Sequence, residues 1–312
     1  MKAAVLTRPS TFKIKNVNVP DIVKEFVPLK VSACGICGSD LAIYPKDPPI
    51  PFYWPGHEIS GYAGDQLYVV NPLIHCAECS CCRSGKVNLC EQVKMVSHHL
   101  PGGFAEYVYV PESSLKAIHA SPEVATLVEP VASSLHAIGK ARISKEDKVV
   151  IVGGGLIGLL ILQLLHLQGL EEVTLIAKYD FQQKLALKWN SVKLNAIPDI
   201  VILAVGGDGS ALQYAVDTVK PQGKVIAMGN IYHSCPLNLK WLVEHEVLVS
   251  GSQRYLNHEF DQAAEIIEKN LIDLRPLITH EFCLEEITKA FETAKDKMAH
   301  QSIKVLIKPG EK

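Results

Sequence analysis

VVIVGGGLIGLLILQLL, residues 149–165, is the stretch of this sequence that decides the fold. Its β-branched apolar start indicates a buried strand, its glycines a tight turn, and the apolar run after them a helix. The glycines fit the pattern G-x-G-x-x-G in a strand–turn–helix context. There they let a pyrophosphate approach the backbone and the positive end of the helix, so the stretch predicts a dinucleotide site. Its candidate contacts are Gly153, Gly155, Leu156, Ile157 and Gly158.

Strands and helices alternate in the chain after this stretch. We expect strands at 173–176, 200–205 and 224–228, with a helix at 211–219. Such alternation predicts a parallel sheet with helices on both faces, which is a doubly wound Rossmann domain, here placed at 131–253. Three further candidate cofactor contacts lie at or just after the ends of the later strands, namely Val205, Gly229 and Ser252.

The adenosine end of this site favours NADP over NAD. NAD-binding versions of the motif place an acidic residue at the end of the second strand, where it binds the ribose hydroxyls. Here that strand is followed by Ala177, Lys178 and Tyr179. Without the carboxylate, and with Lys178 adjacent, a 2′-phosphate would be attracted and not repelled. Asp180 comes three positions too late for the usual contact, although a rearranged turn would still bring it into use.

Size and composition narrow the class of protein. The chain has 312 residues, 48% of them hydrophobic and 21% charged, so it can bury a large core and is expected to form two domains. A formal net charge of -2 and the lack of a basic run argue against nucleic acid as a partner. Residues 1–17 alternate like a strand and lack the pattern of a signal peptide, and the apolar segment 156–170 is short for a membrane span. We therefore expect a cytoplasmic protein that does not bind a membrane.

Five of the nine cysteines fall within residues 76–90, a clustering that favours a metal over disulfides in a reducing compartment. Four of them follow C-x-x-C-x-x-C with the fourth after a seven-residue spacer. Tight loops of this kind let four thiolates close a tetrahedron around Zn²⁺ with no position left for water, so the site would be structural. Cys81 fits no ligand position. The predicted ligands are Cys76, Cys79, Cys82 and Cys90.

The first hundred residues are short apolar runs broken by Pro and Gly, which predicts an all-β domain. Within them ACGICGSDLA, residues 33–42, holds cysteine, serine and aspartate close together. Two more segments with metal-binding side chains, PGHE at 55–58 and LVEP at 127–130, lie farther along the chain, and no local spacing links them. Such residues, taken singly, are more often ordinary core or surface groups than ligands. The candidates are Cys37, His57, Glu58 and Glu129.

In order along the chain, the motifs CGICGSD, PGHE, the four-cysteine segment, GGFAEYVYVP, LVEPVASSLHA, GGGLIGL and PLITHEF resemble those of the zinc-dependent medium-chain dehydrogenase/reductase family. The resemblance covers nearly the whole chain. Glu129 and the segment QRYLN at 253–257 are most similar to the sorbitol and threonine dehydrogenase branch. The resemblance implies a GroES-like β domain at 1–130, completed by 254–312, with the Rossmann domain at 131–253 between these parts.

The resemblance also implies a second metal site. Cys37, His57 and a glutamate would hold a catalytic zinc, with Glu58 and Glu129 both open as the glutamate, so that each chain would bind two zinc ions. Asp40 would orient His57 through a hydrogen bond to its ring.

The remaining implied roles concern the substrate. Ser39 would take up the proton of the alcohol while hydride passes to C4 of the nicotinamide. Arg254 and Tyr255 resemble residues near the substrate hydroxyls of sorbitol dehydrogenase, which favours a polyol or sugar. The family also suggests a homodimer or a homotetramer.

The sequence departs from the family at three places. The passage between His57 and Cys76 is short, so part of the β barrel would be trimmed. Between Trp189 and Asp199 the chain has only NSVKLNAIP where a strand and a helix normally stand, so the nucleotide sheet should lose most of a βα unit. Ala42 occupies a position where the family often has a histidine that passes the proton to solvent.

These observations predict a zinc-dependent oxidoreductase that transfers hydride between the CH–OH group of an alcohol, polyol or sugar and NAD(P). One alternative is a zinc-free NADPH quinone or enone reductase on the same fold, which would lack Cys37, His57 and Glu129 together. The other is an inactive zinc-lobe binding module, for which the shortened segments argue.

Overall fold

The computed structural model describes residues 1–19, 23, 25–48, 53–193, 196–207, 209–229, 234 and 237–310. The chain divides into two compact units. Met1–Glu129 and Leu256–Lys312 together form the first unit, and Pro130–Tyr255 forms the second.

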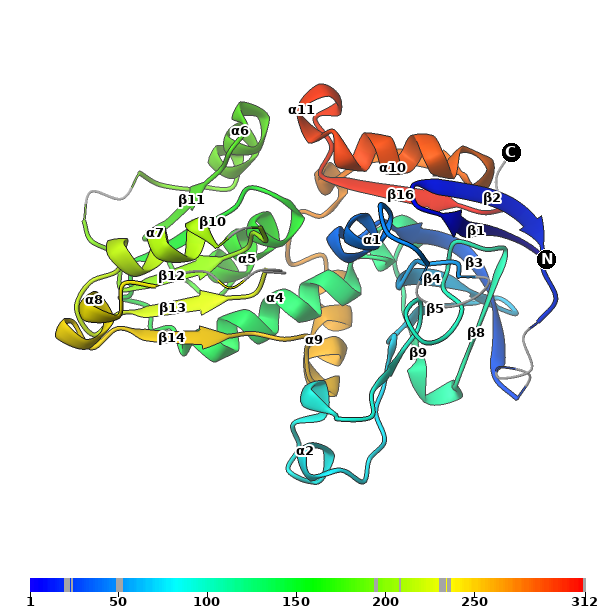
Figure 1. Cartoon of the computed structure of the whole chain (residues 1–312), viewed down its shortest axis with the longest axis horizontal. Coiled ribbons are helices and arrows are strands. Elements are labelled where there is room, and N and C mark those ends of the chain that lie inside the picture. The colour runs from blue at the N-terminus through cyan, green and yellow to red at the C-terminus, as the bar shows by residue number, and fades with distance from the viewer. Residues whose placement is uncertain are drawn as a thin grey trace. The chain divides into compact units, whose positions relative to one another are not determined.

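The first unit is built on a seven-stranded sheet (Figure 1). Its central strand β3 pairs antiparallel with β16 on one side and with β4 on the other, while the first half of β3 also pairs with β8. Among the described strands of this sheet, β15 and β16 are the one parallel pair. The strands of this unit are β1 (Lys2–Arg8), β2 (Thr11–Asn16), β3 (Val27–Gly35), β4 (Glu58–Ala63), β5 (Gln66–Val70), β6 (Leu73–Ile74), β7 (Lys94–Met95), β8 (Tyr107–Val110), β9 (Leu115–Ala117), β15 (Ile278–Cys283) and β16 (Lys304–Lys308).

Helix α10 supplies an apolar face to the core of this unit. Its buried residues recur at helical spacing, and Phe291 packs against Phe12, Tyr44 and Phe104 with ring centroids 4.7, 4.8 and 5.7 Å away. The helices here are α1 (Gly38–Ile43), α2 (Ser80–Arg83), α3 (Pro122–Ala125), α9 (Asn257–Glu268), α10 (Ile287–Lys295) and α11 (Lys297–His300), with 3-10 turns at Val87–Leu89, Glu112–Ser114, Arg275–Leu277 and Leu284–Glu286.

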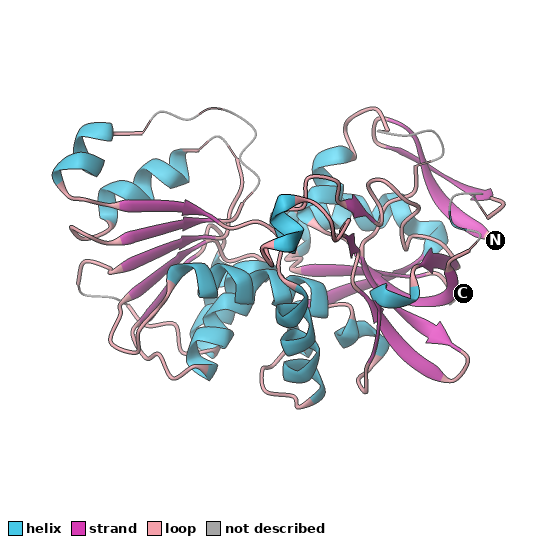
Figure 2. Cartoon of the chain, turned by 90° about the horizontal axis from the view of Figure 1, so that it is seen from below, coloured by secondary structure: helices cyan, strands magenta, loops and turns pink. Residues whose placement is uncertain are grey.

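The second unit is a parallel sheet with helices on both faces (Figure 2). The strand order is β11-β10-β12-β13-β14, so the chain starts in the interior of the sheet and winds outward in both directions. Helix α5 packs on β10 and β11, whereas α7 packs on β12 and β13. The elements are α4 (Val128–Ala141), β10 (Val149–Val152), α5 (Leu156–Leu167), β11 (Val173–Ile176), α6 (Asp180–Lys188), β12 (Ile200–Leu203), α7 (Ser210–Thr218), β13 (Lys224–Ala227), α8 (Leu239–Glu244) and β14 (Leu248–Gly251). The predicted doubly wound domain is thus confirmed, with element ends shifted by one or two residues.

The nucleotide sheet is shortened, as the sequence predicts. The usual order of six strands would place one more strand outside β11, and the described residues of 189–199 contain no strand or helix. Instead, Ser191 and Val192 cover the outer side of β11. Leu175 N donates to Ser191 Oγ at 2.8 Å, and Val192 N donates to Val173 O at 3.0 Å. Leu194 and Asn195 of this segment lie outside the described residues.

Within the described parts of the chain, no helix combines the length and the apolar character needed to cross a membrane.

Candidate metal centres and nucleotide site

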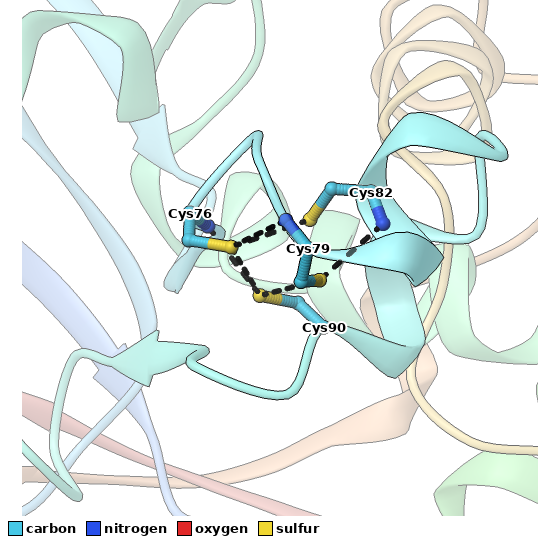
Figure 3. A group of neighbouring side chains, drawn as sticks. All are labelled: Cys76, Cys79, Cys82 and Cys90. Atoms are coloured by element: carbon cyan, nitrogen blue, oxygen red, sulfur yellow. Dashed lines mark hydrogen bonds between the residues drawn. The ribbon is translucent and has the colours of Figure 1, made fainter.

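Four cysteine sulfurs converge in one loop of the first unit, as Figure 3 shows. Cys90 Sγ lies 3.5 Å from Cys76 Sγ and 4.0 Å from Cys79 Sγ, and Cys76 Sγ lies 3.9 Å from Cys82 Sγ. Zn–S bonds of about 2.3 Å in a tetrahedron place the sulfurs about 3.8 Å apart. The spacing of these side chains therefore fits a zinc ion held by sulfur alone.

Backbone N–H groups point at the same sulfurs, which stabilises their thiolate forms. Cys79 N lies 3.3 Å from Cys76 Sγ, and Cys76 N lies 3.4 Å from Cys90 Sγ. The N–H of Cys82 lowers the pKa of the Cys79 thiol to about 6. Cys81 lies in helix α2 but is not a member of the four-sulfur group.

A second group consists of Cys37, His57 and Glu58, whose potential ligand atoms all lie within 4.8 Å of one another. Cys37 is the N-cap of helix α1, and the pairing of β3 with β4 places Glu58 opposite Gly35. A Cβ at Gly35 would lie 1.9 Å from Glu58 Oε2, so only glycine leaves room for this carboxylate. One thiol, one imidazole and one carboxylate are three ligands of the kind that hold a catalytic zinc and leave a fourth position open.

The start of helix α1 fixes the surroundings of His57. Asp40 is buried, and its Oδ2 accepts from Cys37 N at 2.9 Å, while its Oδ1 lies 3.8 Å from His57 Nδ1. Burial raises the pKa of Asp40. Burial lowers the pKa of His57, but the negative charges of Cys37 and Asp40 outweigh this and leave it well above its usual value. The group is thus a buried cluster of strongly interacting charges.

The Ser39 hydroxyl is buried in the same helix and makes no hydrogen bond to any residue that the structure describes. A buried hydroxyl without a partner costs free energy, so its partner is expected to be a bound molecule. This hydroxyl lies two residues from Cys37 in the sequence.

The glycine turn of the second unit forms a close-packed cradle. Gly153 has φ +123°, and a Cβ at Gly158 would lie 1.8 Å from Gly153 O. A Cβ at Gly229 would lie 1.7 Å from Val205 O, so the segments that follow β12 and β13 approach each other equally closely. Gly155 is the N-cap of helix α5, where backbone N–H groups are free to bind an anion. These residues, together with Ser252 after β14, lie at the carboxyl ends of the strands, where doubly wound sheets bind ligands.

Comparison with known proteins supports the fold of both units. A sequence model of the Alcohol dehydrogenase GroES-like domain matches residues 24–120. The sorbitol dehydrogenase of Halalkalibacterium halodurans is 28% identical, and the alignment covers 99% of each chain. These comparisons support the predicted resemblance to the zinc-dependent medium-chain dehydrogenase/reductase family, in its sorbitol and threonine dehydrogenase branch.

Two solved structures superpose on the whole chain. A protein of Escherichia coli CFT073, described as a short chain alcohol dehydrogenase and complexed with NADH, is 25% identical with a TM-score of 0.90 and 99% coverage of both chains. A protein of Sinorhizobium meliloti 1021, described as a zinc-binding dehydrogenase and bound to NADP, is 26% identical with a TM-score of 0.89 and 99% coverage of both chains. The predicted combination of a GroES-like domain and a Rossmann-like domain is therefore confirmed, and the protein is a dehydrogenase.

This dehydrogenase is shorter than its relative. The alignment with the Halalkalibacterium enzyme runs over 347 positions, although the present chain has 312 residues. The relative therefore contains segments that this chain lacks, which agrees with the short sheet of the second unit.

Among the candidate ligands of this dehydrogenase, Glu58 has a partner that the sequence does not reveal. Lys304 Nζ lies 2.5 Å from Glu58 Oε2 and 3.0 Å from Ile36 O, and the side chains of Lys304 and Glu58 are only 3% and 2% exposed. Burial lowers the pKa of Lys304, but the Glu58 carboxylate raises it above its usual value. Lys304 is therefore a buried counter-charge for the Glu58 carboxylate.

Glu129, the other candidate glutamate, is not a member of the three-residue group. It lies in the first turn of helix α4 and interacts electrostatically with His57 and Glu58. Burial raises the pKa of Glu129 to about 7. Glu58 and Glu129 both remain open as the zinc-binding glutamate.

The predicted contacts of the cofactor and the substrate in the second unit are placed as follows. Lys178 is exposed and lies two residues after the end of β11, with its Nζ 5.4 Å from the centre of the Tyr179 ring. Arg254 has φ +53°, and Tyr255, the last residue of the unit, is almost fully buried. Their roles stay predictions.

Proposed function

We propose that this dehydrogenase transfers a hydride between the CH–OH group of an alcohol, polyol or sugar and NAD(P), with one catalytic and one structural zinc per chain. The observation that carries the proposal is the second metal group. Cys37, His57 and Glu58 meet in the first unit, and the buried Ser39 hydroxyl has no hydrogen-bond partner among the described residues. A zinc-free reductase on this fold would have no reason to keep these side chains together.

The residues of the chain divide the work of this reaction. A zinc ion bound by Cys37 and His57 would act as a Lewis acid that lowers the pKa of the substrate hydroxyl. Ser39 takes up the proton of that hydroxyl while it passes its own proton on to the cofactor ribose or water, and its oxygen is available because it has no hydrogen-bond partner among the described residues. Asp40 accepts from the backbone N–H of Cys37, which fixes Cys37, and it places a carboxylate 3.8 Å from the His57 ring without a hydrogen bond to it.

NADP is the proposed cofactor, with NAD as the alternative. Lys178 supports NADP because it lies just after β11, where an acidic residue would otherwise bind the adenosine ribose. The solved relatives do not decide the choice, since one holds NADH and the other NADP. We expect Lys178→Ala to raise the KM for NADP about tenfold and to leave the KM for NAD unchanged. A preference for NAD that survives this substitution would contradict the assignment.

A polyol or sugar is the proposed substrate class. The sorbitol dehydrogenase relative supports it, and so does the pair Arg254–Tyr255 that the chain has in common with that branch. A guanidinium and a phenol together offer several hydrogen-bond donors to a substrate with many hydroxyls.

A homodimer or homotetramer in the cytoplasm is the proposed state of the protein. Strand β14 is at the edge of its sheet, and Leu248 and Val249 on it are exposed. An exposed edge strand with apolar residues is a natural site for self-association. The cytoplasm would keep the four cysteines reduced for zinc.

The test combines metal analysis with turnover. We expect two zinc ions per chain, and we expect turnover on at least one member of a panel of polyols, sugars and secondary alcohols with NADP or NAD. Removal of the weaker zinc by a chelator should abolish turnover, and added zinc should restore it. One zinc per chain together with no binding of NAD(P)H would instead identify an inactive zinc-lobe module.

A further inference from the structure

The hydroxyl of Ser97 lies between two histidine rings next to the second metal group. Ser97 Oγ is 3.4 Å from His57 Nδ1 and 3.1 Å from His98 Nδ1, and the centres of the two rings are 5.9 Å apart. Ser97 is fully buried, whereas His98 is half-buried. The three side chains thus form a continuous hydrogen-bonded row that ends at His57.

The backbone at Ser97 is held in a conformation that serine rarely adopts. Its φ is +79°, in the left-handed region that favours glycine. The loop fixes this conformation, because Ser97 N donates to Leu100 O at 2.9 Å and Val96 bridges to Leu100. Such strain persists where the surrounding structure enforces it, and it is found most often at functional sites. Here it accompanies the placement of one hydroxyl between two rings.

Ser97 Oγ is the nearer hydrogen-bond partner of His57 Nδ1. Asp40 Oδ1, the acceptor expected from the sequence, is 3.8 Å away, and it makes no hydrogen bond among the described residues. The potential ligand atoms of His57 and Cys37 lie within 4.8 Å of one another. With Nδ1 directed at Ser97, Nε2 is the ring atom left for a metal ion.

The Ser97 hydroxyl can hydrogen-bond to both rings, but only one direction of these two bonds leaves His57 able to bind a metal ion. A hydroxyl has one proton to donate and lone pairs to accept with. If it donates to His98 Nδ1, its lone pair is free to accept Nδ1–H of His57. The His57 tautomer with the proton on Nδ1 is the one whose Nε2 lone pair can bind zinc. His98 therefore sets the direction of the row.

We propose that Ser97 and His98 are positioning residues that hold His57 in its metal-binding tautomer and orientation, and so set the zinc affinity of the Cys37 group. This inference rests on the proposed function, because it presumes that the group binds zinc. It concerns affinity and geometry, and neither residue is required to touch the substrate.

Ser97→Gly is the decisive variant, because glycine removes the hydroxyl and at the same time relieves the left-handed strain, so that the chain should fold. Competition with a chelator measures the affinity of each zinc site, and cobalt substitution reports the ligand geometry of the Cys37 group by its visible spectrum. We expect the affinity of this group to fall about 10- to 100-fold and the cobalt spectrum to change, while the four-cysteine site keeps its zinc.

Two substitutions at His98 sharpen the test. His98→Gln keeps a side-chain oxygen that can accept from Ser97 and should retain most of the zinc affinity, whereas His98→Leu should lose as much as Ser97→Gly. His99→Ala is the matched control. His99 Nδ1 accepts from the backbone N–H of Met95 and is not part of the row, so this substitution should leave the zinc affinity unchanged.

The outcomes separate this inference from the function on which it rests. Affinities within twofold of the parent in Ser97→Gly and His98→Leu would overturn the inference alone. A parent chain that holds zinc only at the four cysteines would overturn the proposed function, and the inference with it.

Discussion

The two candidate metal sites of the first unit differ in how the chain builds them. The four-cysteine site comes from one loop of fifteen residues, and the backbone N–H groups of that loop bond its sulfurs. The Cys37 group instead joins a helix cap to a strand, and the side chains of Asp40 and Lys304 surround it. The first site offers four equal ligands and suits a closed structural ion. The second offers a thiol, an imidazole and a carboxylate, with the Ser39 hydroxyl close in sequence, and suits a catalytic ion.

Removal of the Cys37 thiol should separate the two sites most clearly. We expect Cys37→Ala to lower turnover by about a thousandfold or more, because the Lewis acid that supplies several kcal/mol of stabilisation is lost. The fold should persist, since the bond from residue 37 to Asp40 uses the backbone N–H. Zinc analysis should fall from two ions to one, and unchanged turnover would refute the catalytic site.

The opposite result is expected at the four-cysteine loop. Cys90→Ser should lower the free energy of unfolding by about 5 kcal/mol or more, because binding of a structural zinc is worth about 10 kcal/mol in small domains. Limited proteolysis should then cut within residues 76–94.

Cys81→Ser is the matched control for this loop, since Cys81 is not a member of the four-sulfur group. Its stability and zinc content should equal those of the parent. Equal losses in Cys81→Ser and Cys90→Ser would argue against the assigned ligands.

The buried counter-charge of the second site should also matter for stability. Lys304→Met leaves Glu58 buried without its ion pair, which should cost about 3–5 kcal/mol in urea unfolding. Lys308→Met, on the same strand, removes a more accessible cation that lies 3.0 Å from Glu123 Oε1. We expect that control to cost about 1 kcal/mol or less. Equal losses of unfolding free energy in the two variants would show that the Lys304–Glu58 pair contributes no more to stability than the Lys308–Glu123 pair.

The smallest expected effect concerns the route of the proton at the second site. Ala42→His would add a side chain that titrates near pH 6.5 at the end of helix α1. We expect a new inflection near that pH in the profile of turnover, with little change in the maximal rate. A profile identical to that of the parent would count against a missing relay at this position.

The same contrast explains how much of the molecule could be predicted from its sequence. The four cysteines and the glycine turn are local patterns, because in each case the physical requirement lies within one loop. The four sulfurs lie together, and the glycine turn leaves no room for a Cβ. Lys304 could not be found this way. It reaches Glu58 because Gly35 on β3 pairs with Glu58 on one side and with Leu306 on the other, and sheet register between distant segments leaves no spacing signal.

The Ser97–His98 row was equally hidden from the sequence. Two adjacent histidines in a polar loop look like surface residues, and the left-handed turn that aims Ser97 at His57 depends on the closure of the loop with Leu100. A serine followed by two histidines predicts such a row only when the conformation of the loop is already known.

The shortened nucleotide sheet has a consequence for how the protein behaves at high concentration. Loss of a βα unit would normally leave β11 as a bare edge, and bare edges recruit other chains into aggregates. The segment that remains after the loss supplies Ser191 Oγ and the backbone of Val192 to the outward groups of that strand. A few residues thus cover the edge that a whole strand would otherwise pair with. A chain that lacked these residues as well would be prone to assemble into fibres through β11.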